Sequence, residues 1–159
     1  MNSVTVRPAR ADDANSFLLL VKGLADYEKL SPPDAAGQGR LVEAAFGEKK
    51  RFDVLLAEIA GEAVGYAVIL ETYSTFLASP KLFLEDLFVK PEHRGSGAGD
   101  ALLRACAREA ITRGCVRMEW VVLDWNEPAI RFYRNRGASH LKEWYTFGLD
   151  RDELTSLSL

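Results

Sequence analysis

Residues 82–99, with the sequence LFLEDLFVKPEHRGSGAG, constrain the fold of this chain more than any other stretch. An apolar, strand-like run that carries two adjacent acids, Glu85 and Asp86, leads into a glycine-rich turn, and a long helical pattern follows at once. This order of elements binds anions, because backbone N–H groups and the positive end of the helix dipole both face the turn. The stretch therefore predicts a strand, a turn and a helix with an anion site beside two carboxylates.

Three phosphate-binding patterns can be compared with this turn. A dinucleotide fingerprint, G-x-G-x-x-G, is met at Gly95 and Gly97 but has Asp100 in its last place. A P-loop needs Lys and then Ser or Thr after the second glycine, and the turn has neither there. A third pattern, R-x-x-G-x-G, is met in full by Arg94, Gly97 and Gly99. Taken alone, the turn fits a phosphate-binding loop or an ordinary connection between a strand and a helix.

Apolar periodicity in the remainder predicts a chain of the mixed α/β class. The expected strands are residues 4–7, 52–59, 63–72, 82–89, 115–123 and 140–149, the last as one strand or a pair. The expected helices are residues 11–27, 35–46, 97–113, 126–137 and 150–154, and residues 73–80 are expected to form a loop. A meander of strands comes first, and an alternation of strands and helices follows it.

The bulk composition is typical of one globular domain. The 159 residues are enough to bury a core, and they predict a single domain over residues 1–159. A net charge of -3 lacks the basic footprint of general nucleic-acid binding, whereas mild acidity suits a small cationic substrate. The apolar runs are too short to cross a bilayer, and the N-terminal residues lack a signal-peptide core. We therefore expect no nucleic-acid partner, no membrane and a cytoplasmic location.

The cysteines and histidines do not predict a metal site. Cys106 and Cys115 are expected to be buried or half-buried thiols, because disulfides are rare in a reducing compartment. His93 and His140 are not clustered with the cysteines in the sequence, so no set of metal ligands is expected.

Several motifs spread over nearly the whole chain resemble one enzyme family. They are VRPARADD, LADYE, LEDLFVKPEHRGSGAG, DWNEPAIRFYRNRGA and the closing EW…F. Together they resemble the diamine, polyamine and thialysine acetyltransferases of the GNAT N-acetyltransferase superfamily. WNEPAIRFY and LEDLFV are the specific parts, whereas R-x-x-G-x-G marks only the superfamily. The resemblance implies a central, mostly antiparallel twisted sheet of six to seven strands, with a splayed central pair and flanking helices.

The resemblance also implies acetyl-CoA as cosubstrate and places its binding residues. The pantetheine arm would bond to the strand backbone at Leu87, Phe88 and Val89. The residues implied for the pyrophosphate are Arg94, Gly95, Ser96, Gly97, Ala98, Gly99 and Asp100, the last with its side chain turned away from the anion. Glycines suit this place because no Cβ blocks the phosphates. Asn126, Pro128 and Tyr133 complete the implied cofactor set, although Asn126 equally suits a helix cap.

Amine attack on a thioester requires that the amine first lose a proton. With a lysine-like pKa of about 10.4, a primary amine is roughly 99.9% protonated at pH 7. The resemblance implies that Glu85 lies near the reacting amine, as a base acting through water or as a holder of the cation. An ion pair with a neighbouring Arg or Lys is the structural alternative for Glu85. Adjacent residues of a strand face opposite ways, so Asp86 is left with a substrate role or a structural one.

The leaving thiolate needs a proton, and Tyr133 matches the general acid of the family. A phenol with a pKa near 10 is a suitable donor to a thiolate. The alternative for Tyr133 is a core tyrosine on a helix face, with Ile130 one turn before it.

A cationic substrate calls for acids and aromatic faces. The candidates are Tyr27, Glu28, Glu85, Asp86, Glu119, Trp120 and Trp144. Tyr27 equally fits the last apolar position of its helix, and Trp144 equally fits a core or an interface. The polyamine enzymes carry an acid and a tryptophan in a D-P-W run where this chain has Ser74-Thr75-Phe76-Leu77. Short amines, diamines or lysine analogues are therefore better supported than long polyamines.

Two other functions use the same residues. A protein or peptide acetyltransferase, acting on lysines or N-termini, shares the chemistry but needs a peptide groove. A non-catalytic acyl-CoA-binding module shares the fold, although the presence of Glu85, Asn126 and Tyr133 argues against it. The resemblance implies a homodimer with the C-terminal strand at the interface, where Trp144 and Phe147 could make contact.

Overall fold

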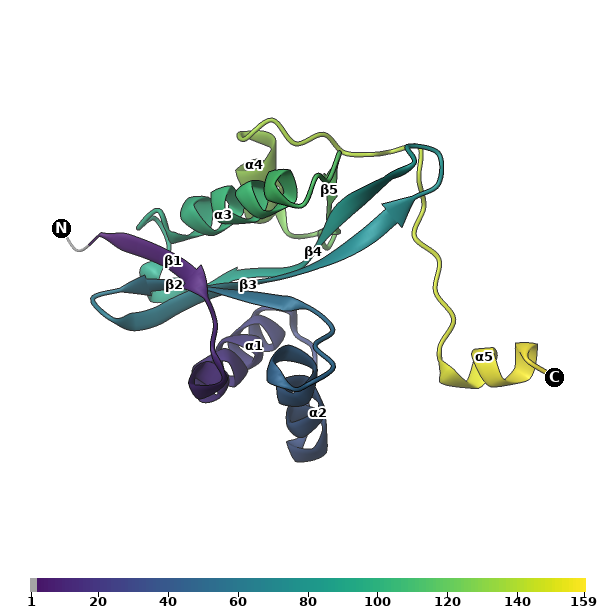
Figure 1. Ribbon diagram of the computed structural model, residues 1–159, viewed down its shortest axis with the longest axis horizontal. Helices are drawn as coiled ribbons and strands as arrows, with labels where there is room; N and C mark the ends of the chain where they lie inside the picture. Colours follow the sequence, from purple (N-terminus) through teal and green to yellow (C-terminus); the bar gives the residue numbers. More distant parts are fainter. Residues whose placement is uncertain (1–2) are drawn as a thin grey trace. The chain divides into compact units, whose positions relative to one another are not determined.

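The computed structural model describes residues 3–159, and the backbone contacts divide the chain into two compact units. The first unit ends at Val121, and the second comprises Val122–Leu159. Figure 1 labels the helices and strands of both units along the chain.

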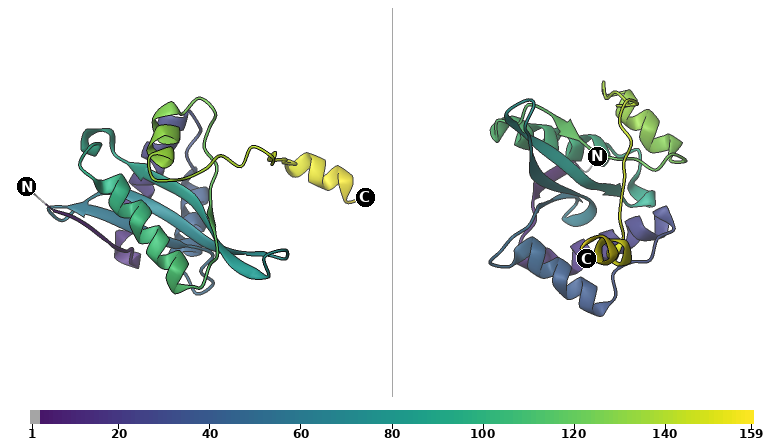
Figure 2. Two further views of the ribbon diagram at one scale, coloured as in Figure 1. Left: turned by 90° about the horizontal axis from the view of Figure 1, so that it is seen from above. Right: turned by 90° about the vertical axis from the view of Figure 1, so that its right-hand side faces the viewer.

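The first unit is a five-stranded sheet with helices on both faces. Its elements are β1 (Val4–Pro8), the 3-10 turn η1 (Ala11–Asp13), α1 (Ala14–Glu28), α2 (Ala35–Phe46), β2 (Asp53–Ile59), β3 (Glu62–Ser74), β4 (Ser79–Val89), η2 (Pro91–His93), α3 (Ala98–Thr112) and β5 (Met118–Glu119). The strand order follows the sequence; β1 to β4 pair antiparallel, and β5 pairs parallel to β4. Helices α1 and α2 lie on one face of the sheet, and α3 runs along the other (Figure 2).

Aromatic side chains join α1 to the sheet. Phe17 of α1 meets Tyr66 of β3 edge-on at 5.6 Å between ring centroids, and both side chains are fully buried. Phe88 of β4 lies in the same cluster, and a Cβ at Gly23 of α1 would come within 2.9 Å of its ring. Only glycine at position 23 lets the helix come this close to β4. The packing therefore holds the C-terminal half of α1 against the strand that carries Glu85 and Asp86.

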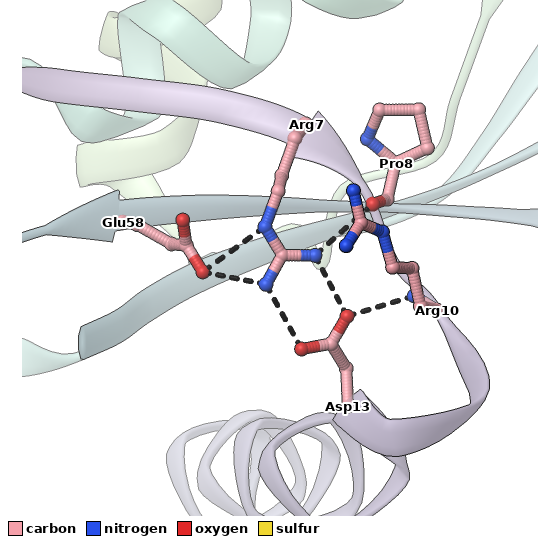
Figure 3. A network of polar contacts seen from close by, with 5 residues as sticks. All are labelled: Arg7, Pro8, Arg10, Asp13 and Glu58. Carbon is pink, nitrogen blue, oxygen red and sulfur yellow. Dashed lines mark hydrogen bonds and ion pairs between the residues drawn. The ribbon is translucent and has the colours of Figure 1, made fainter. Parts of the chain in front are cut away.

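An ion network ties β1, η1 and β2 together (Figure 3). The guanidinium of Arg7 donates to both carboxylate oxygens of Asp13 at 2.7 and 2.9 Å, and to Glu58 at 2.6 Å. The backbone N–H of Arg10 also donates to Asp13, at 2.7 Å. The hydrogen bonds from Arg7 lower the pKa of Asp13 to about 2. The network fixes the start of α1 on the sheet, because η1 leads directly into that helix.

Most of the predicted elements are confirmed, including an α2 that spans residues 35–46 as expected. The side chain of Asp34 caps α2 by accepting a hydrogen bond from the N–H of Gly37 at 2.7 Å. Gly114 has a φ of 68°, as expected for a residue that ends a helix. The predicted α/β class and the mostly antiparallel sheet are also confirmed.

The loop predicted for residues 73–80 was wrong. Tyr73 pairs with Pro80 and Ser74 with Ser79, so β3 and β4 form a hairpin in which only residues 75–78 are outside the strands. Polar residues and a proline suggested a loop, but Thr72 and Tyr73 favour strands, and a proline is tolerated near the start of a strand.

Two predicted strands differ from the structure for one physical reason. Within residues 115–123, only Met118 and Glu119 form a strand, pairing with Leu82 and Phe83. Residues 140–149 form no strand within the described chain. Alternating apolar residues give a segment the capacity to form a strand, but the strand needs a hydrogen-bonding neighbour. The described residues therefore show five strands rather than the six to seven expected.

The second unit contains two short helices, α4 (Glu127–Arg134) and α5 (Arg151–Leu157). Between them, the segment 138–150 has no regular structure, and several of its large apolar side chains are exposed. The helix predicted for residues 150–154 is present as α5, which begins one residue later and ends three residues later.

Candidate functional site

The glycine-rich turn follows β4 and leads into α3. Gly95 and Gly97 have φ angles of 79° and 91°, values that a side chain rarely permits, and Gly97 is the residue that precedes α3. The hydroxyl of Ser96 accepts a hydrogen bond from the N–H of Ala98 at 3.3 Å. Apart from the glycines themselves and their chain neighbours, no atom of residues 3–159 lies within 4 Å of where a Cβ would stand on Gly95 or Gly97. The turn thus presents an open backbone surface at the positive end of a helix dipole.

Arg94 joins this turn to the end of α1. Its guanidinium carbon lies 4.6 Å from the ring centroid of Tyr27, and its Nε is 3.4 Å from the carbonyl oxygen of Val89. Tyr27, predicted as a substrate residue, is therefore a platform for the cation of the anion-binding turn.

Asp100 lies in the first turn of α3, and its carboxylate accepts a hydrogen bond from Arg104 at 2.6 Å. Arg104 lies one helical turn further on, so the acid is compensated along the helix surface. This arrangement agrees with the expectation that the Asp100 side chain turns away from an anion at the helix N-terminus.

The outer edge of β4 is open beside the turn. β5 pairs only with Leu82 and Phe83, so the stretch from Leu84 to Val89 has no strand on that side among residues 3–159. The Phe88 side chain is buried in the core, at 4% exposure, so only its backbone can meet a ligand at this edge.

Glu85 occupies a β-bulge, which the sequence did not reveal. Ile69 pairs with Leu84 and the next residue, Val68, pairs with Asp86, so Glu85 is an extra residue in β4. Leu84 and Asp86 therefore face opposite sides of the sheet although they are two positions apart, and strict alternation fails here. The alternation that was expected to turn Glu85 and Asp86 to opposite faces is therefore interrupted at Glu85.

Asp86 is bonded to a tyrosine and surrounded by acids. The hydroxyl of Tyr66 donates to Oδ2 of Asp86 at 3.1 Å. Burial raises the pKa of Asp86 to about 6; the bond from Tyr66 acts against this rise, and the charges of Glu85 and Glu28 add to it. Burial also raises the pKa of Glu28, at the end of α1. Glu28, Glu85 and Asp86 thus form an acidic cluster that suits a cationic ligand.

Glu119 and Trp120 lie at β5. Lys81 donates to Glu119 at 2.7 Å, Arg117 lies 3.4 Å from the same carboxylate, and the bond from Lys81 lowers the pKa of Glu119. Two cations already compensate this acid, so its environment favours a structural role over contact with a substrate. Trp120 directly follows β5 and is half-buried.

The second unit holds the other predicted residues. Oδ1 of Asn126 accepts a hydrogen bond from the N–H of Ala129 at 3.3 Å, which confirms the predicted helix cap. Pro128 lies in the first turn of α4, and Tyr133 lies near its end, edge-on to Phe132 at 5.2 Å between ring centroids. Trp144, in the irregular segment, is 75% exposed. That Glu85 and Tyr133 act on the same reaction, Glu85 at the amine and Tyr133 at the thiolate, stays a prediction.

Tyr66 is the residue that sequence reasoning missed. It stands in the apolar strand GYAVIL, and only its hydroxyl distinguishes it from a core phenylalanine. A buried tyrosine normally finds a hydrogen-bond partner for that hydroxyl, so a search for acids opposite it would have pointed to Asp86. Within residues 3–159, no three His, Cys, Asp or Glu side chains are grouped so that they could hold a metal ion.

Comparison with known proteins relates the whole chain to one family. The model of the acetyltransferase (GNAT) family matches residues 23–138, which is more than half of the chain. Thialysine N-epsilon-acetyltransferase of Sus scrofa is 36% identical over 169 aligned positions, covering 99% of both chains. Spermidine/spermine N(1)-acetyltransferase-like protein 1 of Homo sapiens is 30% identical over 99% of this chain and 24% of its own length.

Among solved structures, an integron cassette protein from the mobile metagenome of V. cholerae superimposes with a TM-score of 0.82. It covers 98% of both chains at 23% sequence identity, so this likeness shows the fold alone.

Proposed function

Because this chain belongs to the acetyltransferase (GNAT) family and is an acetyl-CoA-dependent N-acetyltransferase of the thialysine and polyamine group, we propose that it acetylates a primary amine of a small cationic substrate. The observation that carries this proposal is the acidic cluster, in which Glu28 at the end of α1 lies near Glu85 and Asp86 of the strand that leads into the anion-binding turn. The names of its relatives support a diamine, a polyamine or a thialysine-like amine.

The residues of the turn fit the pyrophosphate of acetyl-CoA. Gly95 and Gly97 leave open space above the backbone, and Arg94 adds a positive charge that Tyr27 supports. The open edge of β4 at residues 87–89 suits an extended pantetheine arm, which bonds to a strand edge as a further strand would. Asn126 and Pro128, at the start of α4, are proposed to complete the cofactor site.

The chain's own side chains would move two protons. Glu85 holds the cationic amine or takes its proton through a water molecule, while the nitrogen attacks the acetyl carbonyl. Tyr133 then protonates the departing thiolate, because the reference pKa of a phenol is close to that of a thiol. Without such a donor the thiolate leaves as a charged species, so loss of Tyr133 affects turnover more than binding.

The extent of the substrate is limited by residues 74–77, at the tip of the β3–β4 hairpin. Phe76 is 98% exposed there, and the D-P-W run of the polyamine enzymes is missing. We therefore favour short amines, diamines and lysine analogues, held by the acidic cluster with Trp120 or Trp144 as aromatic neighbours.

We further propose that both units act as one acetyltransferase domain. The family match covers residues 23–138 and so crosses the boundary at Val121. The buried thiols of Cys106 and Cys115 are unpaired, which supports a reducing compartment, the cytoplasm.

A homodimer is proposed for the segment 140–149. Trp144, Tyr145 and Phe147 are 75%, 84% and 92% exposed, and the predicted strand lacks a neighbouring strand among residues 3–159. A second copy would supply that neighbour. A dimer mass in solution that falls to a monomer mass after Trp144→Ser and Phe147→Ser supports this, and a monomer at all concentrations contradicts it.

The function is tested with acetyl-CoA, a panel of primary amines and a set of lysine peptides, with release of thiol as the readout. Turnover on a diamine or a lysine analogue supports the proposal. Turnover on peptides alone indicates a protein acetyltransferase. Tight binding of acetyl-CoA without turnover on any amine identifies an acyl-CoA-binding module instead.

A further inference from the structure

The buried hydroxyl of Tyr66 and the bulge at Glu85 give the two adjacent carboxylates different surroundings. We propose that Asp86, oriented by Tyr66, accepts the proton of the substrate ammonium, whereas Glu85 holds the cation. The inference rests on the proposed function, since it divides two roles within the amine site. Tyr66 is a positioning residue, because it acts only through Asp86.

The first support is the rigidity of Tyr66. Its ring is fully buried, edge-on to Phe17 at 5.6 Å and tilted against Phe88 at 6.4 Å between ring centroids. The hydroxyl of a ring held in this way can rotate its proton but cannot leave its place. The bond of 3.1 Å to Oδ2 therefore sets the position of the Asp86 carboxylate and leaves Oδ1 for another partner.

The second support is the bulge. In a regular strand, Asp86 would share a face with Leu84, on the side of the sheet where Ile69 lies. The extra residue turns Asp86 to the side of Val68 and Tyr66, which belong to the core cluster beneath α1. Glu85, the bulged residue, is exposed, whereas Asp86 is partly buried. One acid is thus accessible to a solvated cation, and the other lies deeper beside a fixed phenol.

The third support is the charge around Asp86. The groups that act on it are Tyr66 from β3, Glu28 from α1 and Glu85 from its own strand. Burial raises the pKa of Asp86 to about 6. A carboxylate with a pKa about two units above the ordinary value removes a proton from an amine about 100-fold more effectively at equilibrium.

The proton transfer balances without another reactant. The ammonium gives one proton to Oδ1 of Asp86, and the freed lone pair of the nitrogen forms the C–N bond at the acetyl carbonyl. The C–S bond then breaks, its electron pair goes to sulfur, and the thiolate takes a proton from the proposed acid Tyr133. The nitrogen releases its second proton to water, and Asp86 and Tyr133 return to their starting states by exchange with solvent.

The first experiment measures the titration of Asp86 without any turnover. Carboxyl carbon NMR on protein labelled at aspartate follows the titration of Asp86 in the wild type and in Tyr66→Phe. The matched control is Tyr73→Phe, on the exposed part of the same strand. The signal of Asp86 is assigned by its loss in Asp86→Asn. The bond from Tyr66 favours the ionised carboxylate, so its loss moves the midpoint upward by about one pH unit. The control leaves the midpoint unchanged. An unshifted midpoint in Tyr66→Phe overturns the role of Tyr66, and a wild-type midpoint below pH 4.5 overturns the assignment of Asp86 as the base.

The second experiment follows kcat/KM against pH for acetyl-CoA and a short diamine. The ionisation of the diamine is common to all variants, so differences between profiles belong to the enzyme. We expect the acidic limb to move with the NMR midpoint in Tyr66→Phe. Asp86→Asn should lower kcat at least 100-fold, and Glu85→Gln should raise KM with kcat within about fivefold. Near-normal kcat in Asp86→Asn, or loss of the limb in Glu85→Gln alone, overturns the assignment. If no amine is acetylated, the proposed function fails, while the NMR result still decides the coupling.

Discussion

Two aspartates in the first unit have pKa values displaced in opposite directions. Asp13 accepts hydrogen bonds from the guanidinium of Arg7, and its pKa falls to about 2. Asp86 accepts a bond from a neutral phenol in a partly buried place beside two further acids, and its pKa rises to about 6. The nature of the hydrogen-bonding partner decides what an acid can do. A paired cation makes Asp13 a permanent anion that holds structure, whereas Asp86 can exchange a proton near neutral pH.

The largest expected effect concerns Tyr133, in the second unit. Tyr133→Phe removes the proposed donor to the thiolate, so we expect kcat to fall about 100-fold or more, with the affinity for acetyl-CoA unchanged. Steady-state kinetics and calorimetry measure the two quantities. Phe132→Leu, the neighbouring change on the same helix, serves as the control. An unchanged kcat in Tyr133→Phe would contradict the role of Tyr133 as the proton donor to the thiolate.

The next largest effect concerns the stability that Asp13 gains from Arg7. Arg7→Met leaves Asp13 and Glu58 without their cation, and we expect a loss of about 2 kcal/mol in the free energy of unfolding at pH 7. Urea denaturation measures it. The loss should disappear as pH falls from about 4 towards 2, because the lowered pKa of Asp13 stabilises the fold only above its unfolded value.

As the matched control, Arg104→Ala breaks the exposed pair with Asp100 and should leave the free energy of unfolding nearly unchanged. If both variants lose the same stability, the network in Figure 3 stabilises the fold no more than an exposed ion pair does.

Stability should depend on the charge of Asp86 in the opposite direction from that of Asp13. Its pKa is raised, so its contribution to stability is fully present below the unfolded value near 4 and is lost as pH rises through about 6. Asp86→Asn keeps the shape but removes that charge, so we expect a gain of about 1 to 2 kcal/mol at pH 7 and almost none at pH 4. Thermal unfolding at the two pH values measures the gain. Destabilisation at pH 7 would show that Asp86 is a structural anion like Asp13.

The smallest effect concerns Glu119. Because Lys81 and Arg117 already compensate its charge, Glu119→Gln should change KM for the amine less than twofold and stability by less than 1 kcal/mol. Amine saturation curves at fixed acetyl-CoA measure KM. A tenfold rise in KM would show that Glu119 contacts the amine although Lys81 and Arg117 compensate its charge.

Local signals predicted much of the fold. The pattern of residues 35–46 predicted α2, and Asn126 predicted the start of α4, because a cap acts within three residues of itself. The glycine turn before α3 is equally local: its positive φ angles need glycine wherever they occur. The bulge at Glu85 could not be read in this way, because it depends on the register between β3 and β4.

The motifs also placed Arg94 and the glycines in one turn before a helix, and the structure has that turn. Arg94 and the glycines lie at the helix start where the resemblance placed them, whereas Tyr27 was assigned to the substrate and lies under Arg94. Residues 140–149 carry a strand-like alternation, but alternation does not create a partner strand.

The sequence by itself determined the family, the chemistry and the elements whose start and stop signals are local, because these depend on residue types and short spacings. Which acids are paired with a cation and which can take up a proton followed only from the tertiary structure, since this depends on contacts between distant segments. Arg7 meets Glu58 from 51 positions away, and Tyr66 meets Asp86 from 20. Those contacts distinguish an aspartate that holds the fold from one that can take a proton.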